Sequence, residues 1–260
     1  MPSAPFSTTQ AVELGKFVLS AYDLFSNPDP DAVPGLPAGY ALVAKIYADD
    51  ITTGVVSDFK VFGFIARSGG DVVVAIRGTE DVFEWIADVE FRLVDFPFVK
   101  AGRTEHGFTS FYSSLRTGPS NGQPRAIDVL AALVKGGGVT SLRITGHSLG
   151  AALATLLAID VAANAGFANP VIYTFASPRV GDKVFAGTYD GLVETSWRVA
   201  NVNDVVTQLP PQFVGYLHVD ADFPINSDDH TKHTITCLHS LETYLNTLDP
   251  GVPLDPKCVR

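Results

Sequence analysis

Hydrophobic residues recur at helix or strand spacing along most of the chain. Over residues 9–25 the apolar positions lie close to helical spacing, and the polar, proline-containing stretch after Phe25 ends the pattern. Three segments that follow have the composition of strands: 40–47, 61–67 and 71–77. The pair Gly69 and Gly70 joins the last two strands as a hairpin. The apolar run from Val72 to Ile76 is typical of a central strand that is covered on both faces.

Strand and helix patterns alternate in the rest of the chain. The predicted strands are 141–145, 170–176 and 196–201, and the predicted helices are 107–115, 125–134, 151–165, 184–189 and 234–248. Such alternation predicts an α/β fold with a mostly parallel central sheet flanked by helices, to which the early hairpin adds antiparallel strands. No change of composition marks a linker in the 260 residues, so we expect one domain spanning 1–260.

Residues 80–99 combine helical spacing with unusual apolar area. The apolar side of this segment comprises Val82, Phe83, Trp85, Ile86, Val89 and Leu93, and acidic residues fill much of the other side. Because the segment directly follows the strand at 71–77, it is interpreted as an amphipathic lid helix over a site at the end of that strand. The alternative is an ordinary surface helix whose apolar side completes the core.

Net charge, apolar runs and cysteine content indicate which partners and which cellular compartment to expect. The formal net charge is −10 without a basic cluster, which disfavours nucleic acid and anionic membrane surfaces as partners. No apolar run reaches transmembrane length and residues 1–10 lack the features of a signal peptide, so we expect a soluble protein, with a secreted mature form left open. A monomer is favoured. The two cysteines, Cys237 and Cys258, permit one disulfide or two free thiols.

The turn between the strand at 141–145 and the helix at 151–165 carries the strongest chemical signal. Its sequence is Gly146, His147, Ser148, Leu149, Gly150. After a strand and before a helix, Gly-x-Ser-x-Gly is typical of a nucleophile elbow, a turn so tight that both glycine positions must lack a side chain. We therefore predict that Ser148 is a nucleophile. A glycine-rich turn that only caps the helix would leave the two glycines unexplained.

Two backbone amides are candidates for an oxyanion hole. Thr79 lies beside Gly78 at the carboxyl end of the predicted central strand, where its amide can turn toward the nucleophile. The Leu149 amide, directly after the serine, is the second predicted donor. An ordinary strand-end turn is the alternative for Thr79.

A serine nucleophile needs a base, and the base needs an acid to orient it. In a sheet of the α/β-hydrolase type both follow the serine, in the order aspartate, then histidine. Asp204 lies just past the strand at 196–201 and is the predicted acid. Asp182 is the alternative, although its place before the helix at 184–189 favours a helix cap.

His239 is the predicted base, because its place in the last helix beside Leu238 and Leu241 can hold its ring near the carboxyl edge of the sheet. The other histidines are His106, His147, His218, His230 and His233. His147 lies inside the turn, which aims it away from the serine hydroxyl. The loop containing His230, His233, Asp228 and Asp229 is either a metal site or a solvated loop; we favour the solvated loop and expect neither metal nor cofactor.

At this point the sequence resembles a known family, the class 3 or fungal-type triacylglycerol lipases, which have an α/β-hydrolase-like fold. The matching stretches are VVVAIRGTEDVFEWIADV, ITGHSLGAALATLLA, YTFASPRVGDKVFA, RVANVNDVVTQLPP and LHSLETYL, which together span residues 72–245. The resemblance implies Ser148 as nucleophile, Asp204 as acid, His239 as base, an oxyanion hole from Thr79 and Leu149, and a lid that begins after Thr79. Residues 218–232 and the C-terminal tail match no pattern of the family.

We therefore expect a serine carboxylic ester hydrolase, a lid-gated lipase that hydrolyses acylglycerols at a lipid–water interface through an acyl-enzyme intermediate. An esterase for soluble or aromatic, feruloyl-type esters is the alternative within the enzymes, and phospholipase action is left open. A catalytically silent binding protein on the same fold is the alternative outside them, because a fold alone does not guarantee chemistry.

Overall fold

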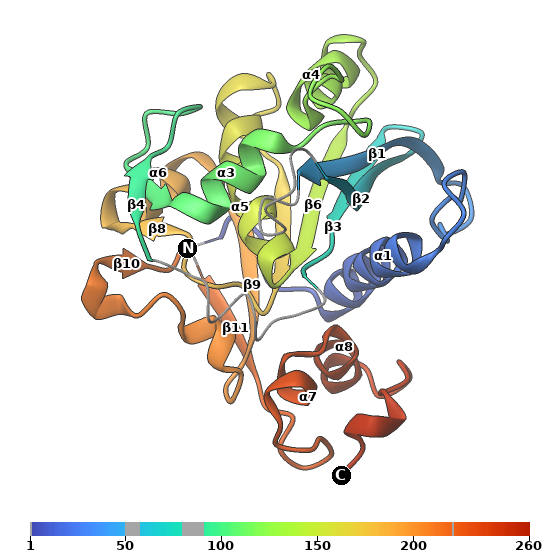
Figure 1. Cartoon of the computed structure of the whole chain (residues 1–260), viewed down its shortest axis with the longest axis vertical. Helices are drawn as coiled ribbons and strands as arrows, with labels where there is room; N and C mark the ends of the chain where they lie inside the picture. Colours follow the sequence, from blue (N-terminus) through green and yellow to red (C-terminus); the bar gives the residue numbers. More distant parts are fainter. Residues whose placement is uncertain (1, 50–57, 80–90, 220) are drawn as a thin grey trace.

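A seven-stranded sheet runs through the molecule in the order β1-β2-β3-β6-β7-β9-β11 (Figure 1). It is seen in a computed structural model that describes residues 2–49, 58–79, 91–219 and 221–260. Its strands are β1 (Ala41–Asp49), β2 (Phe59–Ser68), β3 (Asp71–Ile76), β6 (Ser141–His147), β7 (Val171–Phe175), β9 (Thr195–Asn201) and β11 (Ala221–Ile225). The first three pair antiparallel, and β3 to β11 pair parallel. The predicted mostly parallel sheet with an early hairpin is confirmed.

Helices cover both faces of this sheet. They are α1 (Thr8–Ser26), α3 (His106–Ser114), α4 (Ala126–Lys135), α5 (Leu149–Asn164), α6 (Lys183–Leu192), α7 (Ile235–His239) and α8 (Leu241–Leu248). Short 3-10 helices are η2 (Val205–Gln208), η3 (Gln212–Val214) and η4 (Pro256–Cys258). The side chains of β3 alternate between two buried clusters: Val72, Val74 and Ile76 join the cluster of α3 to α6, whereas Val73 and Ala75 join that of α1 and α8. Strand β3 is therefore covered on both faces, because successive side chains of a strand point to opposite sides of the sheet.

Helix α5 lies against β3, β6 and β7 and is buried over most of its length (Figure 1). Its first thirteen residues, from Leu149 to Val161, are all buried. Gly150 and four alanines lie in this stretch, and their small side chains allow the helix to lie close to the sheet. The turn that precedes α5 is therefore fixed by the core beneath it.

The carboxyl ends of the parallel strands meet at one edge of the sheet. Ile76 pairs with Gly146, and His147 pairs with Phe175, which in turn pairs with Val199. The residues that leave β3, β6 and β9 therefore emerge side by side. In open α/β sheets this edge is where ligands bind.

A second, four-stranded sheet was not predicted. It has the order β10-β8-β5-β4 and consists of β4 (Leu93–Asp95), β5 (Arg103–Glu105), β8 (Gly181–Asp182) and β10 (Tyr216–Leu217). Strands of two or three residues are too short to show alternation in a sequence. Strand β8, with only two residues, is an example.

The segment predicted as a lid is described only in part. Val82, Phe83, Trp85, Ile86 and Val89 lie outside the described residues. From Leu93 onward the helix prediction is wrong, because Leu93–Asp95 forms β4 and pairs with β5. Phe96 follows in the core, where its ring contacts those of Tyr112 and Phe185. Burial of this aromatic residue and pairing with β5 outweigh the helical spacing of the sequence.

The helix predicted at 234–248 is two helices. Helix α7 ends at His239 and α8 begins at Leu241, with Ser240 between them at φ −59° and ψ 135°. This extended residue turns the chain, and its hydroxyl hydrogen-bonds with the Glu242 carboxylate. Apolar spacing does not detect the break, because the buried positions continue on both sides of it.

Candidate active site

Ser148 occupies a strained turn between β6 and α5. Its backbone has φ 57° and ψ −125°, a conformation that residues other than glycine rarely adopt. A Cβ on Gly146 would lie 2.2 Å from the Gly150 carbonyl oxygen, and one on Gly150 would lie 2.3 Å from that of Ile76. Both glycines are therefore required by close backbone approach, as the elbow interpretation predicts.

The structure brings together the three side chains predicted as nucleophile, base and acid. The Ser148 Oγ lies 2.8 Å from His239 Nε2, and His239 Nδ1 lies 2.7 Å from Asp204 Oδ2. All three residues are buried. They come from the end of β6, the end of α7 and the turn after β9, so the sheet edge and one short helix supply the whole arrangement.

The Asp204 carboxylate is held by three donors. Besides His239, the Val206 amide donates to Oδ1 at 2.9 Å, and the Tyr244 hydroxyl donates to Oδ2 at 2.7 Å. Burial and the neighbouring Asp204 charge raise the pKa of Tyr244 well above its ordinary value, so this hydroxyl keeps its proton. The sequence did not single out Tyr244; as part of an apolar pattern on a helix it resembles a core residue.

Asp182, the alternative acid, lies elsewhere and caps a helix. Its carboxylate accepts from the Phe185 amide at 2.9 Å and from Arg103 Nε at 3.1 Å. Burial raises the pKa of Asp182, but these hydrogen bonds and the Arg103 charge outweigh it and lower the pKa below its ordinary value. The cap predicted for this residue is confirmed.

The remaining histidines have other partners. His147 lies against Tyr22 and the main chain of His239. His218 hydrogen-bonds with the Thr207 carbonyl at 2.8 Å, and burial together with Arg198 and Arg179 lowers its pKa to about 3. His230 contacts the Thr247 hydroxyl at 3.2 Å. His106 begins helix α3.

The loop considered as a metal site contains one ion-pair contact, between His233 Nε2 and Asp228 Oδ1 at 3.3 Å. Across the described ranges of the chain, histidine, cysteine, aspartate and glutamate form no group of three or more that could hold a metal ion. The Asp228 carboxylate also accepts from Asn203, one residue before Asp204. This loop therefore braces the turn that carries the candidate acid.

The region predicted as an oxyanion hole lies beside the serine. Gly78 lies just past the end of β3 and packs closely against the serine, because a Cβ on it would lie 2.8 Å from the Ser148 Cβ. Thr79 comes next in the chain and is partly buried. Leu149 is the first residue of α5, so its amide belongs to the N-terminal turn, where the amides have no partner within the helix. Both amides remain predictions as oxyanion donors.

The two cysteines form a disulfide. Cys237 in α7 is bonded to Cys258 in η4, with a Cα–Cα distance of 5.3 Å. The bond joins the C-terminal tail to the helix that carries His239. Of the two states that the sequence permitted, the disulfide is the one found.

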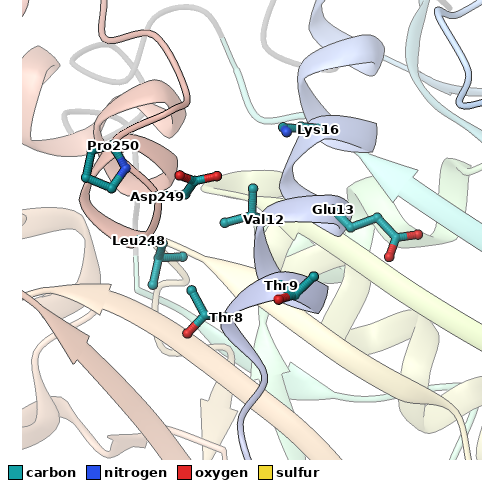
Figure 2. Close-up of a pocket in the computed structure, with 8 residues that line it drawn as sticks. All are labelled: Thr8, Thr9, Val12, Glu13, Lys16, Leu248, Asp249 and Pro250. Carbon is teal, nitrogen blue, oxygen red and sulfur yellow. The ribbon is translucent and has the colours of Figure 1, made fainter.

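A pocket of about 460 Å³ lies away from this site, between the first turns of α1 and the end of α8 (Figure 2). Its lining residues are Thr8, Thr9, Val12, Glu13, Lys16, Leu248, Asp249 and Pro250. None of them belongs to the Ser148 site, and none of the polar ones is buried. We therefore place the chemistry at Ser148, on the grounds of its geometry, and not at the pocket.

A buried serine–histidine–aspartate arrangement at the carboxyl edge of a mostly parallel sheet, with the serine on a positive-φ turn, defines the α/β-hydrolase class. Residues 73–214 match the family described as Lipase (class 3). The chain belongs to the class 3 lipase family. Among the helices of the described residues, none is both long enough and apolar enough to cross a membrane.

The chain resembles proteins of two kinds, phospholipases A1 and acylglycerol lipases. Phospholipase A1-II 7 of Oryza sativa subsp. indica is 30% identical over 277 residues, covering 95% of this chain and 67% of that protein. Secreted mono- and diacylglycerol lipase A of Penicillium camembertii is 30% identical, covering 70% of this chain and 56% of that protein. The chain thus spans between half and about two thirds of their lengths.

A solved structure supports the fold. The Rhizomucor miehei lipase propeptide complex has a TM-score of 0.68 at 23% identity and covers 96% of this chain and 83% of that one. At this identity the likeness concerns the fold alone. It agrees with the central sheet and flanking helices described above.

Proposed function

We propose that the chain is a serine carboxylic ester hydrolase that acts as a lipase on acylglycerols. Ser148 is the nucleophile, His239 the general base and Asp204 the residue that orients the base. The single observation that carries the proposal is the continuous hydrogen-bonded path from the Ser148 hydroxyl through His239 to Asp204, on a strained turn. Family membership and the mono- and diacylglycerol lipase relative support the substrate class.

In the first half of the reaction, His239 Nε2 takes the proton of the Ser148 hydroxyl while the oxygen attacks the ester carbonyl carbon. The carbonyl π electrons move to its oxygen and form the tetrahedral oxyanion. When the oxyanion collapses, the carbon–oxygen bond to the alcohol breaks, and protonated His239 gives its proton to the leaving alcohol. An acyl ester on Ser148 remains.

Water completes the cycle by the same steps. His239 takes a proton from water, the hydroxide attacks the acyl carbonyl, and Ser148 leaves with the proton that His239 returns. Asp204 holds His239 with its Nδ1 proton directed at Oδ2, so Nε2 is free to accept. We assign the amides of Thr79 and Leu149 to the oxyanion, where each donor contributes about 3 to 4 kcal/mol to the transition state.

The serine mechanism is tested with Ser148→Ala. We expect hydrolysis of p-nitrophenyl butyrate to fall by about 10⁴-fold or more and labelling by a fluorophosphonate to disappear, because the hydroxyl that His239 Nε2 contacts is lost. Ser113→Ala is the matched control, since Ser113 Oγ donates to the Thr109 carbonyl within α3. A rate retained in Ser148→Ala would overturn the mechanism. A wild-type chain that neither reacts nor labels would instead be a silent binding protein.

Lipase and soluble-ester esterase activities are separated by the physical state of the substrate. Tributyrin hydrolysis is measured across the concentration at which droplets form. A rise in rate at that point is the result expected of a lipase that works at a lipid–water interface, whereas saturation below it supports an esterase. Hydrolysis of methyl ferulate at a comparable rate would favour the aromatic ester alternative. The predicted lid would add to the rise, and its apolar residues 82–89 lie outside the described part of the chain.

Phospholipase A1 activity is the second candidate, because the relative with that name matches 95% of the chain. Phosphatidylcholine in mixed micelles tests it directly. Release of fatty acid at a rate similar to that from diacylglycerol, and its loss in Ser148→Ala, would support this activity at the same site. Hydrolysis of acylglycerols alone would exclude it.

We also propose that the chain works as a monomer in an oxidising compartment, such as the outside of the cell. The Cys237–Cys258 disulfide supports the oxidising compartment, because such bonds persist outside the reducing cytosol. The secreted relative from Penicillium camembertii points the same way. Thiol titration of the protein purified from its native source tests the compartment, and light scattering tests the oligomeric state.

A further inference from the structure

We propose that Tyr22 and His147 are positioning residues that hold the base and the oxyanion segment in place around Ser148. This inference rests on the proposed function. It concerns a second histidine in the site, one that does not act on the substrate, and a tyrosine from the N-terminal helix α1. Together they connect three elements that are far apart along the chain.

Both ring nitrogens of His147 have partners. Its Nε2 lies 2.7 Å from the main-chain oxygen of His239, and its Nδ1 lies 2.8 Å from the Tyr22 hydroxyl. The imidazole rings of His147 and His239 are 4.8 Å apart, and His147 is buried. The residue next to the nucleophile is therefore bonded to the backbone of the base.

Proton positions follow from the partners. A carbonyl oxygen only accepts, so His147 Nε2 carries the proton and Nδ1 is an acceptor in the neutral ring. The Tyr22 hydroxyl then donates to Nδ1, and it accepts from the Gly78 amide at 2.9 Å. Burial lowers the pKa of His147 well below its ordinary value, and the nearby His239 lowers it further, so the ring stays neutral. The result is a directed path from Gly78 through Tyr22 and His147 to His239.

The break between α7 and α8 makes this path available. In a continuous helix the His239 carbonyl would accept from the amide four residues later, that of Thr243. Because Ser240 is extended, α7 ends at His239, and the next main-chain bond in α8 runs from the Tyr244 amide to the Ser240 carbonyl, at 3.2 Å. The His239 carbonyl is left to accept from His147.

The other end of the path fixes the oxyanion segment. Tyr22 holds the amide of Gly78, whose α-carbon is packed so closely that a Cβ would meet both the Tyr22 hydroxyl and the Ser148 Cβ. Thr79, the proposed oxyanion donor, is the next residue. A displacement of 1 Å in such a site can reduce the rate about 100-fold. One tyrosine hydroxyl therefore acts on both the base and the oxyanion hole.

The first test is Tyr22→Phe, which keeps the ring that packs against His147 and removes only the hydroxyl. We expect kcat for p-nitrophenyl butyrate to fall about 10- to 100-fold with KM changed less than 2-fold, because positioning acts on the transition state. Tyr173→Phe is the matched control. Its hydroxyl also accepts from a main-chain amide, that of Ser7 at 3.1 Å, and lies outside the path. We expect it to lower the melting temperature and leave kcat unchanged.

The second test asks whether kcat depends on the hydrogen bonds of His147 or only on the shape of its side chain. The glutamine side chain has a donor group and an acceptor group, whereas leucine has neither. We expect His147→Gln to retain at least 10-fold more kcat than His147→Leu when both are compared per folded molecule. Equal loss in both variants, or a kcat of Tyr22→Phe equal to that of Tyr173→Phe, would overturn the proposal.

A third measurement does not depend on activity. In ¹⁵N-histidine NMR spectra of the full chain, we expect the proton of His147 on Nε2 and a shift of the His239 ring signals in Tyr22→Phe. A proton on Nδ1, or His239 signals identical to wild type, would refute the positioning path even if esters are hydrolysed. Failure of the proposed function is recognised separately, by wild-type protein that does not label with fluorophosphonate.

Discussion

At the scale of single residues, Ser148 shows how the core fixes a strained nucleophile. Its positive φ costs about 1 to 3 kcal/mol, which the surrounding structure must offset. The Ser148 amide donates to the Phe175 carbonyl at 3.0 Å, and the buried α5 begins at the next residue. The hydroxyl is thus held toward His239 by neighbours on β7 and α5.

Exchange of the acid for an isosteric amide tests the orientation of the base. In Asp204→Asn we expect kcat to fall about 10⁴-fold, because the amide can donate to His239 Nδ1 and so stabilise the wrong tautomer. The measurement is steady-state hydrolysis of p-nitrophenyl butyrate. Asp182→Asn is the control: this residue caps α6, so its activity should match wild type. Similar losses in the two variants would contradict the assignment of the acid.

The partly buried His218 predicts a stability that declines in acid. The pKa of His218 is about 3 in the folded protein and 6.5 as the ordinary value in an unfolded chain. Between these two pH values the unfolded chain therefore binds a proton that the folded protein does not. Stability is therefore lost as the pH falls through this window. From pH 7 to pH 5 this group contributes a loss of about 2 kcal/mol in the free energy of unfolding.

Urea denaturation of His218→Gln at the two pH values measures this contribution. The variant should show a smaller decline between pH 7 and pH 5 than wild type does. His233→Gln, at a half-exposed surface position, is the control and should decline as wild type does. An unchanged decline in His218→Gln would show that this histidine does not contribute.

At the scale of elements, the contact between α5 and β3 allows no side chain at Gly150. We expect Gly150→Ala to lose more than about 3 kcal/mol of stability, because its Cβ would overlap the main-chain oxygens of Ile76 and Arg77. Gly187→Ala in α6 is the matched control. A Cβ there meets nothing within 4 Å, so the same exchange should stabilise by about 0.5 to 1 kcal/mol. Thermal unfolding of both variants checks the pair, and equal effects would contradict the packing argument.

Elements with long periodic patterns were predictable. Helices α1 and α5 have apolar residues over most of their length, and the apolar run from Val72 to Ile76 marks β3. Strand β11 was missed because it is short and contains Asp222 and Pro224, which is tolerated at the edge of a sheet. The break at Ser240 was missed because one extended residue leaves no trace in an apolar pattern.

The site, like the fold, was predictable only where its residues form a local pattern in the sequence. The elbow around Ser148 has a local signature, since two glycines and a serine in five residues describe one turn. The order of the partners along the chain then singled out Asp204 and His239. The hydrogen bonds of Tyr22, Tyr244 and His147 have no local signature, because each joins residues at least 40 positions apart. Such partners become visible only when the fold is known.

At the scale of the whole molecule, the net charge of −10 predicts the kind of interface that the protein prefers. Under the proposed function, tributyrin droplets containing anionic lipid should be hydrolysed more slowly than neutral droplets at low salt, because like charges repel. The difference should shrink when ionic strength rises from 0.01 M to 0.15 M, as the Debye length falls from about 30 Å to about 8 Å.

Hydrolysis of soluble p-nitrophenyl butyrate is the control for this experiment and should not depend on salt in the same way, because the substrate is uncharged. Faster hydrolysis of anionic droplets at low salt would contradict the prediction. It would indicate that a local surface, and not the overall charge, determines how the protein approaches lipid.

The origin of the site from distant segments has a consequence for biosynthesis. Tyr22 and His147 are 125 residues apart, and Ser148 and His239 are 91 apart. During translation the elbow is made long before its imidazole partner exists. A ribosome that stops before Asp204 and His239 therefore releases a product with an inert hydroxyl, and esterolytic capability arises only when the segment carrying these two residues has joined the rest.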